Sequence, residues 1–171
     1  MYEVDRKDIV VELEQVPRSS AGAPIPIVLA TEGDVFLAYY LDTSDDWDGE
    51  TTRSVGLDSD GERVVVVRFK WTLAHMFGPP NDEAFEGHPL AARGLAPYRI
   101  FEVQNSSWIR KLERMNAVHP YHDKTRFMQD KKHFVFAFHD STFECVSHGF
   151  TTEIKTGSVR SVVPFMLDAL R

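Results

Sequence analysis

The chain has 171 residues, a length that suits one domain with a core large enough to fold without metals or disulfides. Hydrophobic residues make up 43% and charged residues 26%, as in ordinary soluble domains, while the net charge of −7 argues against nucleic-acid binding, which needs clustered Lys and Arg. The N-terminus lacks a signal-peptide pattern, and no apolar run approaches the roughly 18 residues of a membrane span. We therefore expect a single domain over 1–171 in the cytoplasm, with no nucleic-acid or membrane partner and an oligomeric state that the sequence leaves open.

Apolar and β-branched stretches predict four strands in the first part of the chain, at residues 8–14, 21–30, 35–41 and 62–71. The second contains Pro24 and Pro26, which cannot donate to a sheet ladder, so we expect it at a sheet edge. In the fourth, alternation indicates that one face meets the core and the other emerges into solvent; the inward face carries Val65, Val67, Phe69 and Trp71.

Residues 42–60 are polar and acidic, which raises the question of a calcium loop. A 12-residue loop with Gly49 or Gly61 at its sixth position places Val55 or Val67 where a bidentate Glu is required. Both registers fail. The segment is therefore expected to be a solvated loop that ends in a turn at Asp60-Gly61.

The stretch 74–97 has the composition of a long surface connection with two short helical turns, since Asn81 and Pro89 suit helix starts and Gly94 a helix end. A strand is expected at 98–104. A helix at 106–116 should follow, covering one face of the sheet through Trp108, Leu112 and Met115.

The stretch 133–145 contains three phenylalanines at alternate positions, so their rings share one face of an extended strand. Val135 and Ala137 occupy the other face, which indicates a central strand buried on both sides. We expect paired strands at 133–139 and 142–148 with Asp140-Ser141 as the turn, and a polar bridge at 124–132 before them. After a further strand at 150–155, a C-terminal helix within 158–170 should be interrupted by Pro164.

Together these elements predict an α+β fold. It comprises a curved, mostly antiparallel β-sheet of about eight strands, barrel- or sandwich-like, with two packed helices. The abundance of aromatic residues, twelve Phe, five Tyr and three Trp, has two interpretations. The rings either fill the core or leave an apolar pocket for one small ligand.

Histidines and carboxylates gather in the connection and after the predicted helix, where the candidates are His75, Glu86, His88, His119 and His122, followed by Asp123. Such groups can bind zinc or iron, but their spacing matches no metal-site signature, so we predict no metal or other cofactor. Pro120 lies between His119 and His122, so a regular helix does not align them. His88 precedes Pro89, and we expect it on the surface, lining whatever cleft the connection covers.

A second candidate site is the tip formed by His139, Asp140 and Glu144. With Asp140-Ser141 as the loop, His139 would face Thr142 with Glu144 diagonally near it, so a His–carboxylate general base is one possibility. The alternative is that Asp140 bonds turn amides while His139, expected to be largely buried, packs against a neighbour. The single cysteine, Cys145, excludes an intramolecular disulfide and is expected to be buried and inert.

Several sequence blocks are distinctive when they are taken together, namely Gly87-His88-Pro89-Leu90, Asn105-Ser106-Ser107-Trp108-Ile109 and His139-Asp140-Ser141-Thr142-Phe143-Glu144. Through them, residues 69–146 resemble a group of uncharacterised bacterial proteins. The resemblance suggests a bacterial origin and implies no activity or site residue.

The leading functional hypothesis is a non-enzymatic cytoplasmic module that binds a small molecule or a protein partner, because no complete catalytic constellation is present. A narrower version is an inhibitor of a basic toxin or nuclease, of the immunity-protein kind, that docks through the acidic 42–60 loop. The alternative from another class is a hydrolase or lyase that uses the histidines and carboxylates, with or without a metal.

Overall fold

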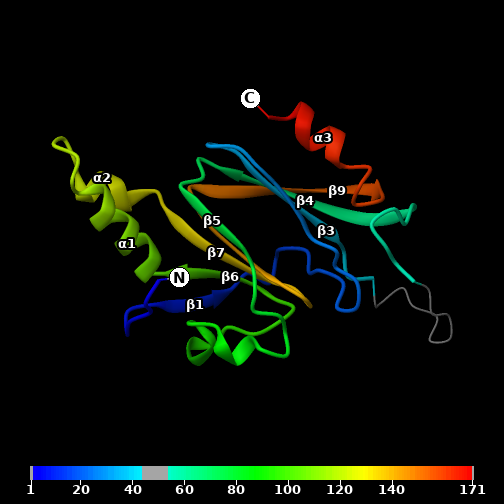
Figure 1. Ribbon diagram of the computed structural model, residues 1–171, viewed down its shortest axis with the longest axis horizontal. Coiled ribbons are helices and arrows are strands. Elements are labelled where there is room, and N and C mark those ends of the chain that lie inside the picture. Colours follow the sequence, from blue (N-terminus) through cyan, green and yellow to red (C-terminus); the bar gives the residue numbers. More distant parts are fainter. Residues whose placement is uncertain (1, 44–53, 171) are drawn as a thin grey trace.

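A computed structural model describes residues 2–43 and 54–170, which form two antiparallel sheets and three α-helices (Figure 1). Part of the acidic loop expected at 42–60 lies outside the described residues. The first sheet has the strand order β1 (Ile9–Glu12), β6 (Ile100–Gln104), β7 (Lys132–Ala137), β8 (Thr142–Ser147) and β5 (Ala74–Gly78). The second has the order β2 (Ile27–Ala30), β3 (Val35–Tyr40), β4 (Glu62–Lys70) and β9 (Gly149–Gly157). The predicted α+β class is confirmed in its sandwich-like form, since neither sheet closes on itself.

The two sheets pack face to face around an aromatic core. Side chains alternate along each strand, so Phe134 and Phe136 of β7 and Phe143 of β8 all point into the space between the sheets. From the second sheet Tyr39 and Phe69 meet them, with the Phe69 and Phe143 ring centres 5.3 Å apart. The prediction of a central Phe strand is confirmed, because every residue of β7 after Lys132 is buried.

Each sheet also buries part of its outer face. The first sheet is covered by α1 (Ser107–Asn116), the 3₁₀ turns η2 (Phe85–Gly87) and η3 (Ala91–Arg93), and the start of the chain. The second is covered by α3 (Val163–Asp168). The expectation that one face of β4 emerges into solvent is therefore wrong for Val64 and Val66, which are buried beneath α3.

The helices differ from the sequence expectation in three respects. The segment expected to be a polar bridge contains α2 (Lys124–Gln129), because the Asp123 side chain accepts a hydrogen bond from the Arg126 N–H and caps a helix start. Pro164 does not interrupt α3 but lies in its first turn, where a missing N–H costs nothing. Met115 is 62% exposed, so the prediction that it covers the sheet is wrong.

Of two turns expected from the sequence, one is shifted by one residue and the other is present. The hairpin between β7 and β8 closes with the Phe138 N–H donating to the Ser141 carbonyl at 2.9 Å, so its loop residues are His139 and Asp140, not Asp140 and Ser141. As a result Glu144 faces Val135 across the strands instead of lying near His139. The turn expected at Asp60-Gly61 is present, with Gly61 in the left-handed region at φ 77°.

Candidate functional site

Glu144 lies at the centre of a buried polar cluster on the outer side of the first sheet. Its neighbours Phe143 and Cys145 point into the core between the sheets, so alternation turns Glu144 to the opposite face, together with Val146. That face is covered by α1 and the 3₁₀ turns, and the carboxylate is only 5% exposed. A charge in such a place needs hydrogen-bond partners to remain ionised.

Three side chains, those of Tyr2, His88 and His133, provide those partners. We call these three residues and Glu144 the Glu144 cluster. The Tyr2 hydroxyl donates to Oε2 at 2.5 Å, His133 Nε2 lies 2.8 Å from Oε2, and His88 Nε2 lies 3.3 Å from Oε1. The Leu90 N–H donates to His88 Nδ1 at 3.1 Å, so Nε2 is the nitrogen that carries the proton and donates to the carboxylate.

The start of α1 fixes the remaining ring in the same way. The Ser106 side chain caps the helix by accepting from the Ile109 N–H, which leaves its hydroxyl proton free to be donated to His133 Nδ1 at 2.9 Å. His133 therefore donates from Nε2 to Glu144. Burial alone would raise the pKa of the Glu144 carboxyl, but the hydrogen bonds from His133 and His88, the electrostatic attraction of His133 and the hydrogen bond from Tyr2 outweigh it and hold the pKa at about 2.

The Glu144 cluster is closed to solvent. The side chains of His88 and His133 are 1% and 0% exposed, so no substrate reaches them in this conformation. The expectation that His88 lies on the surface is wrong, because the 3₁₀ turns fold inward and stack its ring against Phe85. We interpret the cluster as a structural device that ties together the start of the chain, the turns, α1 and two central strands.

A second cluster, formed by Asp82, Tyr98 and His139, lies at the surface. His139 Nδ1 is 3.0 Å from Asp82 Oδ2 and 3.0 Å from the Tyr98 hydroxyl, and that hydroxyl also donates to Asp82. The expectation of a largely buried His139 is wrong, since its side chain is 41% exposed as a loop residue of the hairpin. A carboxylate at Nδ1 holds the proton there and leaves Nε2 as the acceptor of a partly exposed ring, the arrangement of a general base.

The environment of this second cluster shifts two pKa values. The Tyr98 hydroxyl bond, together with His139, holds the pKa of Asp82 below its usual range. The same bond, with a smaller contribution from burial, raises the pKa of Tyr98 to about 12. Asp140, predicted to join His139, is 87% exposed and its Oδ1 lies 4.0 Å from His139 Nε2.

The other predicted site residues are scattered. His75 lies on β5 and stacks on Phe143, and Glu86 is exposed on η2. His119 contacts Tyr121 in the loop after α1, while His122 bonds Glu113 at 2.9 Å. Among the residues that the structure describes, no group of three or more His, Cys, Asp or Glu side chains could hold a metal ion.

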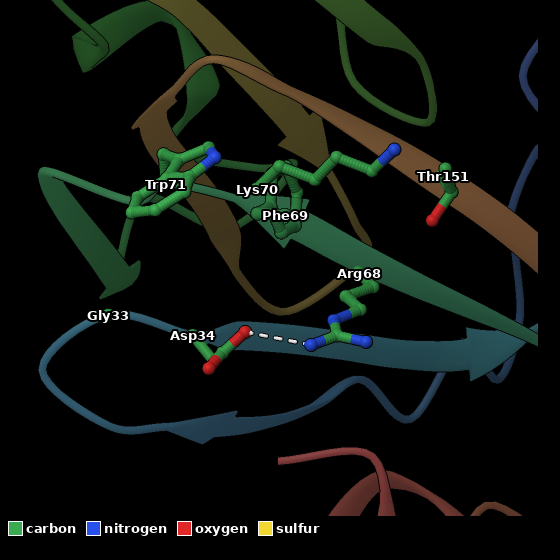
Figure 2. Close-up of a pocket in the computed structure, with 7 residues that line it drawn as sticks. All are labelled: Gly33, Asp34, Arg68, Phe69, Lys70, Trp71 and Thr151. Carbon is green, nitrogen blue, oxygen red and sulfur yellow. Dashed lines mark hydrogen bonds and ion pairs between the residues drawn. The ribbon is translucent and has the colours of Figure 1, made fainter. Parts of the chain in front are cut away.

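A cleft of about 550 Å³ on the outer face of the second sheet was not predicted (Figure 2). It lies where β4 ends, beside the turn before β3, and is lined by Gly33, Asp34, Arg68, Phe69, Lys70, Trp71 and Thr151. Trp71 is 79% exposed and has φ 53°, a conformation that bulky residues rarely adopt. The sequence pattern placed Trp71 on the inward face with Phe69, and that prediction is wrong because the left-handed residue ends the strand alternation.

The two cations of the cleft differ in how firmly they are held. Arg68 donates to Asp34 Oδ1 at 3.1 Å and lies over the Phe36 ring, 5.3 Å from its centre. Lys70 is exposed, and within 2–43 and 54–170 no acidic side chain is paired with it. Figure 2 shows the Lys70 chain extended towards Thr151, with Trp71 at one end of the cleft and Arg68 towards Asp34.

The chain matches no protein-family model, no curated protein and no solved structure. The resemblance of residues 69–146 to bacterial proteins therefore stays a prediction. No helix within the described residues is long and apolar enough to cross a membrane.

Proposed function

We propose that this protein is a non-enzymatic module that binds a small anionic molecule with a planar ring in the Trp71 cleft. The observation that carries the proposal is Trp71 itself. Exposing 79% of a large ring on backbone with φ 53° raises the free energy of the folded chain. Residues that contact ligands often carry such backbone strain.

The charges around Trp71 indicate the kind of ligand. Asp34 neutralises one charge of the Arg68–Lys70 pair, so the lining of the cleft keeps a net positive charge, and Lys70 has no acidic partner among the residues that the structure describes. Arg68 is fixed by Asp34 and Phe36, and its fork of N–H donors suits a carboxylate or phosphate. The volume of about 550 Å³ lies within the range of small-molecule sites.

The test is titration calorimetry with probes that separate the two features of the ligand. Adenosine monophosphate has both ring and anion, adenosine only the ring, and inorganic phosphate only the anion. We expect adenosine monophosphate to bind more tightly than either fragment, with affinity reduced about tenfold or more by Trp71→Ala and by Lys70→Gln. Tyr121→Ala and Lys124→Gln remove an exposed ring and an exposed cation elsewhere, and they should leave binding unchanged.

Two results would reject the proposal. If none of these probes and no other aromatic anion in a metabolite panel binds, or if binding is unaffected by both cleft variants, the proposal is wrong. Binding that depends on Tyr121 instead would move the site to the α1–α2 loop.

The enzymatic alternative is favoured by one observation, the Asp82–His139 pair, in which the histidine side chain is 41% exposed. Such a pair could accept a proton from water attacking an ester. Release of nitrophenolate from p-nitrophenyl acetate tests it, with His139→Gln expected to abolish turnover and His75→Gln, an exposed histidine outside the cluster, expected to preserve it. Equal rates for the two variants would reject this alternative.

A further inference from the structure

β9 differs from the other edge strands in its length. The edges β1 and β2 have four residues each and β5 has five, whereas β9 has nine. Proteins usually keep edge strands short, because their unpaired N–H and C=O groups can pair with another chain. β9 is paired with β4 along its whole length, and no other strand of the described residues pairs with its second edge.

The middle of β9 is exposed on both faces. Thr152 and Ile154 point to the same side as the inter-sheet core, yet both are exposed, and Ile154 is 50% exposed. Thr151 and Glu153 on the other side are exposed as well, so neither the first sheet nor α3 covers this part of the strand. In Figure 1 β9 runs beside β4, with α3 near its end.

The sequence of this exposed segment is complementary to itself. We propose that the free edge of β9 pairs antiparallel with the β9 of a second copy of this chain, about a two-fold axis at Ile154. In that register Glu153 faces Lys155 of the partner subunit and Lys155 faces Glu153 of the partner subunit, while Thr152 faces Thr156 of the partner subunit. Opposite charges directly across strands stabilise a pair, and two-fold symmetry doubles each contact.

The charges also select this register over its neighbours. A two-fold axis at residue 153 places two glutamates opposite each other, and an axis at residue 155 places two lysines opposite each other, which destabilises both arrangements. Charges on an edge strand often prevent pairing. Such charges prevent self-pairing only when like charges meet across the axis. In the register proposed here Glu153 and Lys155 have opposite signs, so they attract each other across the axis.

The contacts within one chain already hold the two charges in place. Lys155 is ion-paired with Glu153 on the same face, and its ammonium lies 4.0 Å from the centre of the Phe165 ring on α3. Pairing would therefore surround each lysine by two carboxylates with little reordering of its side chain. The two second sheets would join into one continuous sheet across the axis.

The test uses charge reversal and the mass of the protein in solution, measured by light scattering during size-exclusion chromatography. We expect the wild-type chain to elute with the mass of two chains. Glu153→Lys and Lys155→Glu should each shift it to the mass of one chain, because each places like charges across the axis. The double swap Glu153→Lys with Lys155→Glu should restore the dimer, as should an equimolar mixture of the two single variants.

Glu14→Lys, on an exposed turn after β1, changes the net charge as Glu153→Lys does and should remain dimeric. Hydrogen exchange of the wild-type chain provides a measurement that needs no variant, since protection of residues 150–156 should rise with protein concentration. A monomer at the highest soluble concentration, a dimer that both single variants leave intact, or a double swap that stays monomeric would each overturn the proposal.

Discussion

The Glu144 cluster and the Asp82–Tyr98–His139 cluster contain the same chemical groups in opposite environments. Each joins a carboxylate to a tyrosine hydroxyl and to imidazole, but the two imidazoles on Glu144 are at most 1% exposed while His139 is 41% exposed. In the first, every polar atom has an internal partner, so the groups contribute to the fold. In the second, the imidazole ring is partly exposed, so its groups are accessible to a substrate. Burial, and not residue type, therefore separates the two roles.

Among the variants that compare the two clusters, Glu144→Ala is expected to lower the free energy of unfolding most. Removing the carboxylate leaves the Tyr2, His88 and His133 donors without an acceptor and opens a void, so we expect a loss of about 3–5 kcal/mol in the free energy of unfolding. Asp82→Ala, the matching change in the exposed cluster, should shift the urea midpoint far less. Equal shifts would mean that the two clusters contribute similarly to the stability of the fold, which would contradict the comparison.

Acidification should separate wild-type protein from Glu144→Gln. The pKa of Glu144 is depressed from 4.5 to about 2 in the folded state, so its contribution to stability is complete above pH 4.5 and is lost as the pH falls towards 2. A shift of this size corresponds to about 3 kcal/mol. Urea melts at intervals between pH 5 and 2 should show a steeper decline for wild-type protein than for Glu144→Gln. Parallel curves would contradict a depressed carboxyl.

Two histidine variants sharpen the comparison further. His88→Ala removes a donor to Glu144 and leaves the Leu90 N–H unpaired, at a cost of about 2–3 kcal/mol. His139→Ala, on the exposed loop, should cost about 0.5 kcal/mol, as for ordinary surface changes. Denaturant melts of both variants decide the matter, and the reverse order would show that the burial of the two rings has been misassigned.

The smallest effect is expected from Tyr98→Phe. Losing the hydroxyl removes the main interaction that lowers the pKa of Asp82, so that pKa should rise towards its ordinary value while the urea midpoint changes little. Carbon-13 NMR titration of the aspartate carboxyls measures the change, with Tyr121→Phe as the control. An unchanged Asp82 titration would remove Tyr98 from the cluster.

The fold was more predictable than the site because its signals are local. The alternating rings of Phe134, Phe136 and Phe138 predict a strand buried on both faces from a few residues alone. The hairpin loop was misplaced by one residue, since Asp140-Ser141 and His139-Asp140 have similar turn chemistry. That single shift was enough to misplace Glu144, because its environment depends on the strand register.

The site residues that were missed depend on contacts that no local pattern records. Tyr2 and Glu144 are 142 positions apart, and the sequence around His133 indicates only the start of a strand. Trp71 continues the alternation of β4 in sequence, and nothing there indicates that its backbone turns left-handed. The cleft that its ring lines also includes Gly33, which lies beside it in space but far from it in the chain.

The sandwich also carries its own reporter. Cys145, the single cysteine, points between the sheets with no exposed surface, and burial raises the pKa of its thiol to about 12. Its thiolate is therefore both scarce and shielded while the two sheets remain in contact. The labelling rate with a thiol reagent thus measures how often the sheets separate, at one chemically defined position and without any introduced probe.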